Sequence, residues 1–136
     1  MLFRSGGILM TADIEKQSES QLIERFKDEY GVLKSDVLVV PHHGSRTSST
    51  DAFIDAVAPA MALVAVGYRS RFRHPNGAVM DRYAARKIPL YRTDLLGAIN
   101  LKFAPDAKGK PVLSTFRDQN RRYWLDQPQR GASAGD

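Results

Sequence analysis

The sequence contains no cysteine. Disulfide bonds and thiolate metal sites are therefore excluded, and any metal ion would have to be held by histidine and carboxylate side chains. No apolar run approaches the roughly 18 residues that a membrane-spanning helix needs. The first ten residues are not a signal peptide either, because Gly6 and Gly7 interrupt their apolar stretch. These absences predict that the chain by itself is soluble.

Acidic residues are in the minority. The 136 residues include 20 lysines and arginines against 15 aspartates and glutamates, which gives a net charge of +5. Such an excess favours a polyanionic partner, of which nucleic acid is one, or an anionic surface. The length fits one domain or part of one. We expect residues 1–125 to form this domain and residues 126–136, which have almost no apolar side chains, to be a disordered tail.

Hydrophobic periodicity predicts strands and helices that alternate along most of the chain. Apolar runs predict strands near residues 8–10, 37–40, 61–66, 90–91, 98–103 and 112–116. Helical spacing follows at residues 15–30, 53–57 and 79–87, with Ser48 and Asp51 resembling a capping box before the second helix. Residues 106–109 form the expected loop of a closing hairpin. This order predicts a layered α/β fold built on one sheet.

Three polar loops follow the first three predicted strands. Asp13 comes directly after the first strand, His42 and His43 after the second, and residues 67–74 after the third. Ligand-binding loops of α/β sheets collect at the carboxyl ends of the strands. The sequence therefore predicts that these three loops form one site.

The two histidines and the aspartate have the chemistry of metal ligands. Adjacent side chains diverge, so one metal ion would take only one of His42 and His43 directly. Imidazole with carboxylate suits zinc, manganese or iron. The carboxylate of Asp13 could bridge two metal ions about 3.5–4 Å apart. The alternatives are a polar turn in which one histidine bonds a carbonyl, and an Asp13 that caps the helix starting near Glu15.

The third loop alternates basic and aromatic residues. Arg69, Arg71 and Arg73 are interspersed with Tyr68 and Phe72, and the loop closes with His74 and Pro75. Guanidinium groups and aromatic rings in this pattern suit a phosphate backbone with stacked bases. The alternative is a solvated basic loop in which Pro75 opens the next helix.

Four segments, taken in order, resemble the ComEC family of competence proteins: L-M-T-A-D-I-E at 9–15, V-P-H-H-G-S-R-T-S at 40–48, R-F-R-H-P at 71–75, and Y-R-T-D with G-A-I at 91–99. Members of this family end in a metallo-β-lactamase-like domain, an αββα sandwich. The resemblance covers about residues 8–101 and implies the C-terminal half of that sandwich. The fold's H-x-(H/D)-x-D-H motif is missing, and Ala12 stands where the family has glycine.

The resemblance implies a set of site residues. Asp13 and His43 would be ligands of a divalent metal, zinc or manganese, with His42 and His74 in the catalytic site. Four arginines would bind DNA: Arg46, Arg69, Arg71 and Arg73. With half of the ligands missing, we expect the chain alone to be inactive and to bind metal weakly. An uncovered sheet face would lead it to self-associate.

The resemblance also implies a setting. The family proteins are inner-membrane channels that pass single-stranded transforming DNA into the cytoplasm. Their metallo-β-lactamase-like domain lies outside the cytoplasmic membrane and is implied to be the nuclease that removes the other strand. The partners would then be DNA and the channel portion of the same protein. Two alternatives stay open: a degenerate domain that binds DNA without cleaving it, and a hydrolase of a small ester or lactone.

Overall fold

The computed structural model describes residues 6–104 and 111–120. In this part of the chain the strands are β1 (Ile8–Met10), β2 (Val37–Val39), β3 (Met61–Val64), β4 (Leu90–Arg92), β5 (Ile99–Lys102) and β6 (Val112–Thr115). The helices are α1 (Lys16–Arg25), the 3-10 turn η1 (Pro41–Gly44), α2 (Asp51–Val57), α3 (Gly77–Ala85), α4 (Thr93–Leu96) and α5 (Phe116–Gln119). The predicted α/β fold is confirmed. The expected hairpin loop and C-terminal tail lie outside the described residues.

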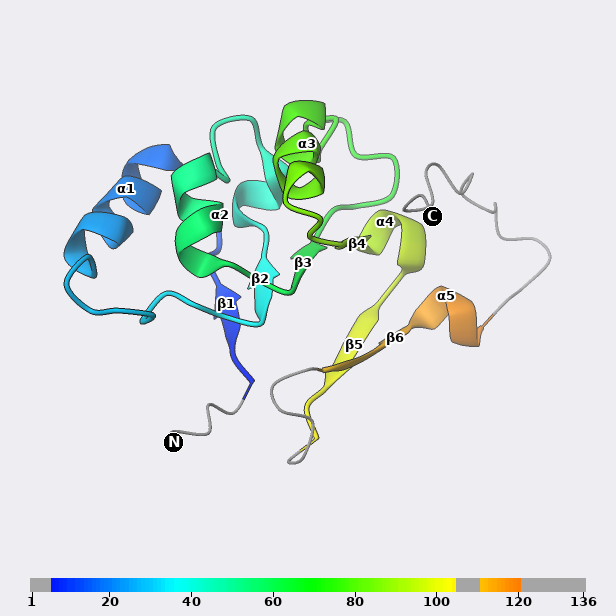
Figure 1. Cartoon of the computed structure of the whole chain (residues 1–136). Coiled ribbons are helices and arrows are strands. Elements are labelled where there is room, and N and C mark those ends of the chain that lie inside the picture. The colour runs from blue at the N-terminus through cyan, green and yellow to red at the C-terminus, as the bar shows by residue number, and fades with distance from the viewer. Residues whose placement is uncertain (1–5, 105–110, 121–136) are drawn as a thin grey trace.

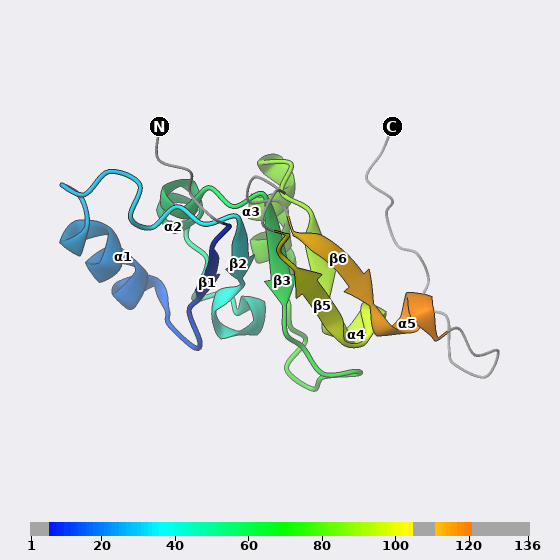
Figure 2. The same ribbon diagram turned by 90° about the horizontal axis from the view of Figure 1, so that it is seen from below.

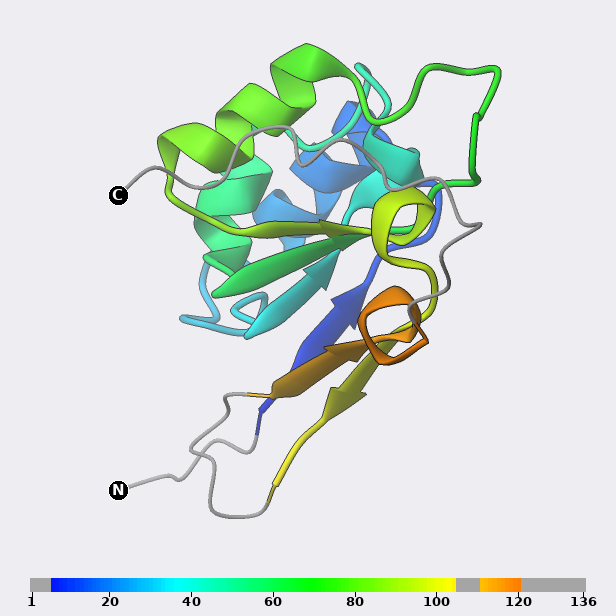
Figure 3. The same ribbon diagram turned by 90° about the vertical axis from the view of Figure 1, so that its right-hand side faces the viewer.

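The first four strands form a parallel sheet in the order β1-β2-β3-β4. Leu9, Leu38 and Ala62 lie side by side in register across three of these strands. All four carboxyl ends therefore lie at one edge of the sheet. Helices α1, α2 and α3 cover a single face of it (Figures 1 and 3).

The hydrophobic core lies between this face and the helices. Leu38 and Ala62 from the sheet are fully buried against Phe53 of α2 and Tyr83 of α3. Because side chains of a strand alternate between the two faces, the neighbours of Leu9 in β1 point away from the helices. These neighbours, Ile8 and Met10, are 43% and 78% exposed. The sheet thus has an apolar, partly exposed face at its β1 edge.

Strands β5 and β6 do not extend the parallel sheet. They pair antiparallel as a separate two-stranded sheet, so the expectation of a single sheet is wrong. The reason lies in the turn after α4, where Gly97 adopts φ 73° and sends the chain away from β4. The amide of Phe116 then donates to the carbonyl of Ala98 at 2.8 Å. The hairpin lies on the side of the sheet opposite the helices (Figures 1 and 2).

Two helix starts differ from the sequence prediction. Helix α2 is capped by Thr50, whose hydroxyl accepts from the amide of Phe53 at 3.3 Å, and not by Ser48. Ser48 is unavailable because its hydroxyl points inward and donates to the carbonyl of Pro41 at 2.8 Å. Helix α1 starts after Glu15 without any side-chain cap, so Asp13 does not cap it. It also ends at Arg25, five residues earlier than expected.

Candidate metal and nucleic-acid site

The loops after β1 and β2 meet at the carboxyl edge of the sheet. Met10 and Val39 are in register, so the two loops start at the same level. The amide of His42 donates to the carbonyl of Ala12 at 3.0 Å. Asp13 Oδ1 then lies 3.6 Å from His43 Nε2. The two side chains that the sequence singled out as metal ligands are therefore neighbours.

The orientation of His43 is fixed from behind. Its Nδ1 lies 2.6 Å from the carbonyl oxygen of Ala65, at the end of β3. A carbonyl can only accept, so Nδ1 carries a proton and donates to it; in the neutral ring Nε2 is then an acceptor on the side of Asp13. Two acceptors that face each other at this distance suit a cation between them. Two ligands of one zinc ion, each about 2.0–2.2 Å from it, lie about 3.4 Å apart, and metal-bound histidines commonly donate their other ring N–H to a carbonyl or carboxylate.

The backbone around the pair is strained. Ala12, His42 and His43 have φ values of 49°, 47° and 55°. This left-handed conformation costs a residue other than glycine about 1–2 kcal/mol. Such residues persist only where the surroundings hold them, and they gather at functional sites. Here Ser48 helps, since its hydroxyl donates to the carbonyls of Pro41 and Ser45.

Glu15 joins the site although the sequence interpretation gave it no role. Its Oε1 accepts from the hydroxyl of Thr47 at 2.8 Å. The same oxygen lies 3.1 Å from Nδ1 of His42, at ion-pair distance but without the alignment of a hydrogen bond. The amide of Lys16 donates to the carbonyl of Thr47 at 2.9 Å. The start of α1 is thereby tied to the turn that follows the histidines.

A second carboxylate supports the same turn from inside the protein. Glu19 is fully buried and accepts from the amides of Ser49 and Thr50 at 2.6 and 2.8 Å. Arg82 donates to the carbonyls of Ser48 and Ser49, and Tyr83 donates to the hydroxyl of Ser49 at 3.1 Å. Burial raises the pKa of Tyr83 to about 12. Sequence reasoning missed Glu19, because polar neighbours made its side of α1 look solvated.

The third loop reaches the site through His74. The ring of His74 lies 6.3 Å from that of His42, which lies 6.4 Å from that of His43. On its other side His74 stacks on Phe72, with ring centroids 6.2 Å apart and planes 17° apart. We call these four rings the aromatic row: His43, His42, His74 and Phe72. The row runs from the Asp13–His43 pair out to the basic loop.

The predicted DNA-binding arginines flank this row on exposed segments. Arg46 lies in the turn after the histidines, and Arg69, Arg71 and Arg73 lie in the loop after β3; all four are exposed. The guanidinium of Arg69 lies over the ring of Tyr68, 5.2 Å from its centroid. Arg117 of α5 approaches the same ring to 5.7 Å. Nothing in the sequence indicated that Arg117 would approach this loop, because Arg117 lies in the helix that follows β6 of the second sheet.

The last of the four ComEC-like segments, residues 91–99, has a structural role. The hydroxyl of Thr93 accepts from the amide of Val66 at 2.8 Å and donates to its carbonyl at 2.7 Å. Asp94 pairs with Arg92 at 2.7 Å and is largely buried. These contacts hold the end of β3, and with it the Ala65 carbonyl that orients His43.

The described residues supply only part of a metal site. Among them, no group of three or more histidine, aspartate or glutamate side chains is arranged to hold a metal ion. Asp13 and His43 offer two ligands with suitable chemistry and orientation. A tight site needs three or four. The donor set thus fits a metal in part, and the remaining ligands would have to come from elsewhere.

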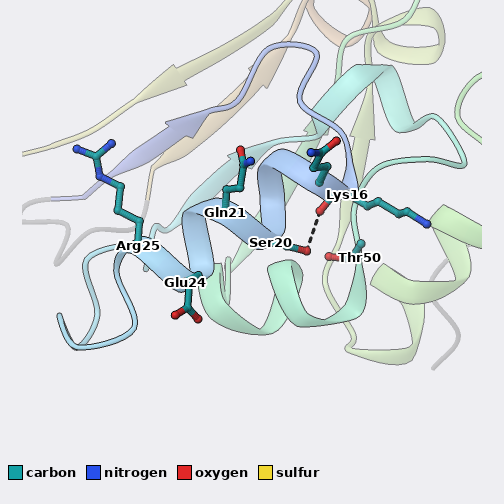
Figure 4. A pocket seen from close by; sticks show the side chains of 7 residues that line it. Lys16, Ser20, Gln21, Glu24, Arg25 and Thr50 are labelled. Atoms are coloured by element: carbon teal, nitrogen blue, oxygen red, sulfur yellow. Dashed lines mark hydrogen bonds between the residues drawn. The ribbon is translucent and has the colours of Figure 1, made fainter.

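In residues 6–104 and 111–120, no helix is long and apolar enough to cross a membrane. A separate hollow beside α1 is lined by Lys16, Ser20, Gln21, Glu24, Arg25 and Thr50 (Figure 4). It contains none of the predicted site residues. Its lining is largely solvated, and we assign it no function.

The structure defines the class of protein: a parallel α/β sheet with histidine and carboxylate side chains in the loops at its carboxyl edge. Similarity to known proteins narrows this class further. The chain is 42% identical over 121 residues to competence protein ComA of Neisseria gonorrhoeae, which covers 89% of this chain and 16% of the relative. It is 33% identical over 101 residues to ComE operon protein 3 of Bacillus subtilis, 73% of this chain and 12% of the relative. Recombination protein 2 of Haemophilus influenzae is 31% identical over 99 residues, which cover 73% of this chain and 12% of the relative.

These relatives point to the ComEC family of competence proteins, as the sequence motifs suggested. The chain spans between 12% and 16% of the length of these curated relatives. No protein-family model matches the chain, and no solved structure matches it.

Proposed function

We propose that this chain forms the metal-binding edge of a metallo-β-lactamase-like domain that hydrolyses phosphodiester bonds of DNA during competence. One observation carries the proposal: Asp13 Oδ1 and His43 Nε2 face each other at 3.6 Å, with His43 held by the Ala65 carbonyl. The names of the relatives, competence and recombination proteins, support DNA as the substrate. The partial αββα sandwich would be completed by the rest of a longer protein.

Asp13 and His43 would hold a divalent cation, zinc or manganese, together with ligands from that longer protein. The chemistry that such a cation supplies is polarisation of a phosphoryl oxygen and activation of a water molecule. His42 and His43, both in left-handed backbone, follow β2 directly at the carboxyl edge of the sheet, where the scissile phosphate would lie.

The neighbouring histidines would act on the substrate directly. Glu15 lies beside Nδ1 of His42, as a carboxylate does when it orients a histidine that moves a proton at its other ring nitrogen. His74 would contact the phosphate from the rim of the site. The exposed guanidinium groups of Arg46, Arg69, Arg71 and Arg73 would bind flanking phosphates.

The likeness to the ComEC family supports a setting for this function. The longer protein would lie in the cytoplasmic membrane, with this domain outside it and next to the channel portion that imports one DNA strand. Its partners would be DNA and that channel portion.

The test uses the full-length protein with linear duplex DNA and Mn²⁺ or Zn²⁺. We expect metal-dependent cleavage that Asp13→Asn and His43→Gln each reduce by at least about 100-fold. Both variants should also weaken Mn²⁺ binding in a calorimetric titration, a readout independent of cleavage. Asp81→Asn, at an exposed position of α3, is the matched control. Full cleavage by Asp13→Asn would refute the proposed role of the pair.

A second candidate is a DNA-binding module of the same fold that does not cleave. This candidate is favoured because the described residues bring together only two metal ligands, whereas a tight metal site needs three or four. It predicts salt-dependent DNA binding without cleavage in any divalent metal. Replacing Arg69, Arg71 and Arg73 by alanine should then flatten the log–log salt dependence by up to about three units. Hydrolysis of a small ester or lactone, with neither DNA cleavage nor DNA binding, would instead support the third alternative.

A further inference from the structure

Phe72 is the most exposed aromatic side chain near the candidate site. It is 74% exposed although a phenylalanine gains about 1.5–3 kcal/mol from burial. The ring is supported from one side by His74, whose plane is 17° from its own. Exposed aromatic rings that are held in place commonly serve as contact surfaces for a partner. The other surface of Phe72 is open to solvent.

The surroundings of Phe72 select the partner's chemistry. Arg71 and Arg73 lie on either side of it in the chain, both exposed and without an acidic partner among the described residues. Arg73 has φ 52°, and its amide donates to the carbonyl of Ser70, so the chain reverses at this point. An apolar ring between two cations suits a ligand that is planar and apolar in one part and anionic in the next. A nucleotide has this character.

Tyr68 plays a different part in the same loop. The guanidinium groups of Arg69 and Arg117 both lie over its ring, at 5.2 and 5.7 Å from the centroid. These contacts tie the base of the loop to α5. Phe72, at the far end of the aromatic row, is therefore the ring presented to a ligand, and Tyr68 is an anchor of the loop.

We propose that Phe72 stacks on an unpaired base of DNA and so directs a single-stranded end to the Asp13–His43 pair. This inference rests on the proposed function and names the form of its substrate. The bases of a duplex are stacked on each other and leave no face for Phe72, whereas an unpaired base has one. The aromatic row connects the two places, because His74 contacts both Phe72 and His42. Arg71 and Arg73 bind the phosphates next to the stacked base.

The test measures binding of three DNA probes by the 136-residue chain: a single strand, a duplex with a single-stranded overhang, and the blunt duplex. We expect the first two to bind about 5- to 150-fold more tightly than the third, the range of one stacked base. Phe72→Ala should remove this difference. Phe72→Trp should keep it, and Phe72→Leu, which is apolar but cannot stack, should lose it. Circular dichroism checks that each variant is folded.

Charge and stacking are separated by a second variant. Arg71→Gln should weaken all three probes alike and flatten the salt dependence by up to about one unit, while Phe72→Ala leaves that slope unchanged. A Phe72→Ala variant that keeps the preference for overhangs would overturn the inference, as would equal binding of all three probes by the native chain. If the preference is present but Asp13→Asn does not affect cleavage by the full-length protein, the stacking of an unpaired base on Phe72 stands, whereas hydrolysis at the Asp13–His43 pair and delivery of the DNA to it fail.

Discussion

Gly44 lies directly against Pro75, so that the loop of the two histidines and the loop that ends in His74 are in contact. A Cβ atom added at Gly44 would lie 2.6 Å from Cβ and 3.1 Å from Cα of Pro75. Gly44 also has φ 80°, which favours glycine. The carbonyl of Gly44 accepts from the amide of Asn76 at 2.9 Å. This contact sets how His42 and His74 face each other.

Gly44→Ala should therefore destabilise the fold strongly. The left-handed backbone and the clash with Pro75 together should cost about 2–5 kcal/mol of the free energy of unfolding, measured in urea. Gly77→Ala is the matched control, because Gly77 opens α3 with space around it. It should change the free energy by less than about 1 kcal/mol, on the stabilising side. A Gly44→Ala variant as stable as the control would show that the two loops can separate.

Glu19→Ala should also destabilise the protein, by about 2–4 kcal/mol. The amides of Ser49 and Thr50 would lose a buried charged acceptor. Glu24→Ala in the same helix is the control: Glu24 is exposed and, among the described residues, forms an ion pair with Lys27 only, so its loss should cost under about 0.5 kcal/mol. Urea unfolding of both variants compares them. Equal losses of unfolding free energy in the two variants would mean that water satisfies the amides of Ser49 and Thr50 in place of the Glu19 carboxylate.

Alkaline pH should weaken the fold through Tyr83. Its pKa is raised from 10.0 to about 12 because the hydroxyl is buried. The folded state then holds the proton more tightly than the unfolded state, so stability is unaffected below pH 10 and falls as pH rises from 10 to 12. In a titration of phenolate absorbance, the native protein should show a late component near pH 12 that Tyr83→Phe lacks. Identical titration curves for the two proteins would contradict the burial of this hydroxyl.

Self-association of the chain stays a prediction. The β1 edge exposes Ile8 and Met10 on the face opposite the helices, and exposed apolar surface of this kind favours contact with a second copy. Light scattering at micromolar concentration should give a mass above the 15.2 kDa of one chain. Met10→Lys should lower that mass, whereas Tyr30→Lys, at a 93% exposed position after α1, should not. A 15.2 kDa species in all three proteins would mean that the face is closed within one chain.

The sequence by itself determined the alternation of strands and helices and the edge at which the site forms. Apolar runs such as 37–40 and 61–66 have the short length and unbroken apolar character of strands covered on both faces, and parallel strands present their carboxyl ends together. Asp13 and His43 follow two such strands directly. Their proximity could therefore be predicted without coordinates, as could a place for His74 at the rim.

The tertiary structure alone decided which groups hold these residues. The carbonyl of Ala65 orients His43 from 22 residues away, and Glu19 reaches the amide of Ser49 from a distance of 30 residues. Arg117 approaches Tyr68 from α5, the helix that follows the second sheet. A periodic pattern reports which face of an element is buried, but it does not report which backbone group or distant side chain lies opposite. Those partners are fixed only when the helices pack on the sheet, because a buried polar atom must be satisfied by whatever group the packing brings to it.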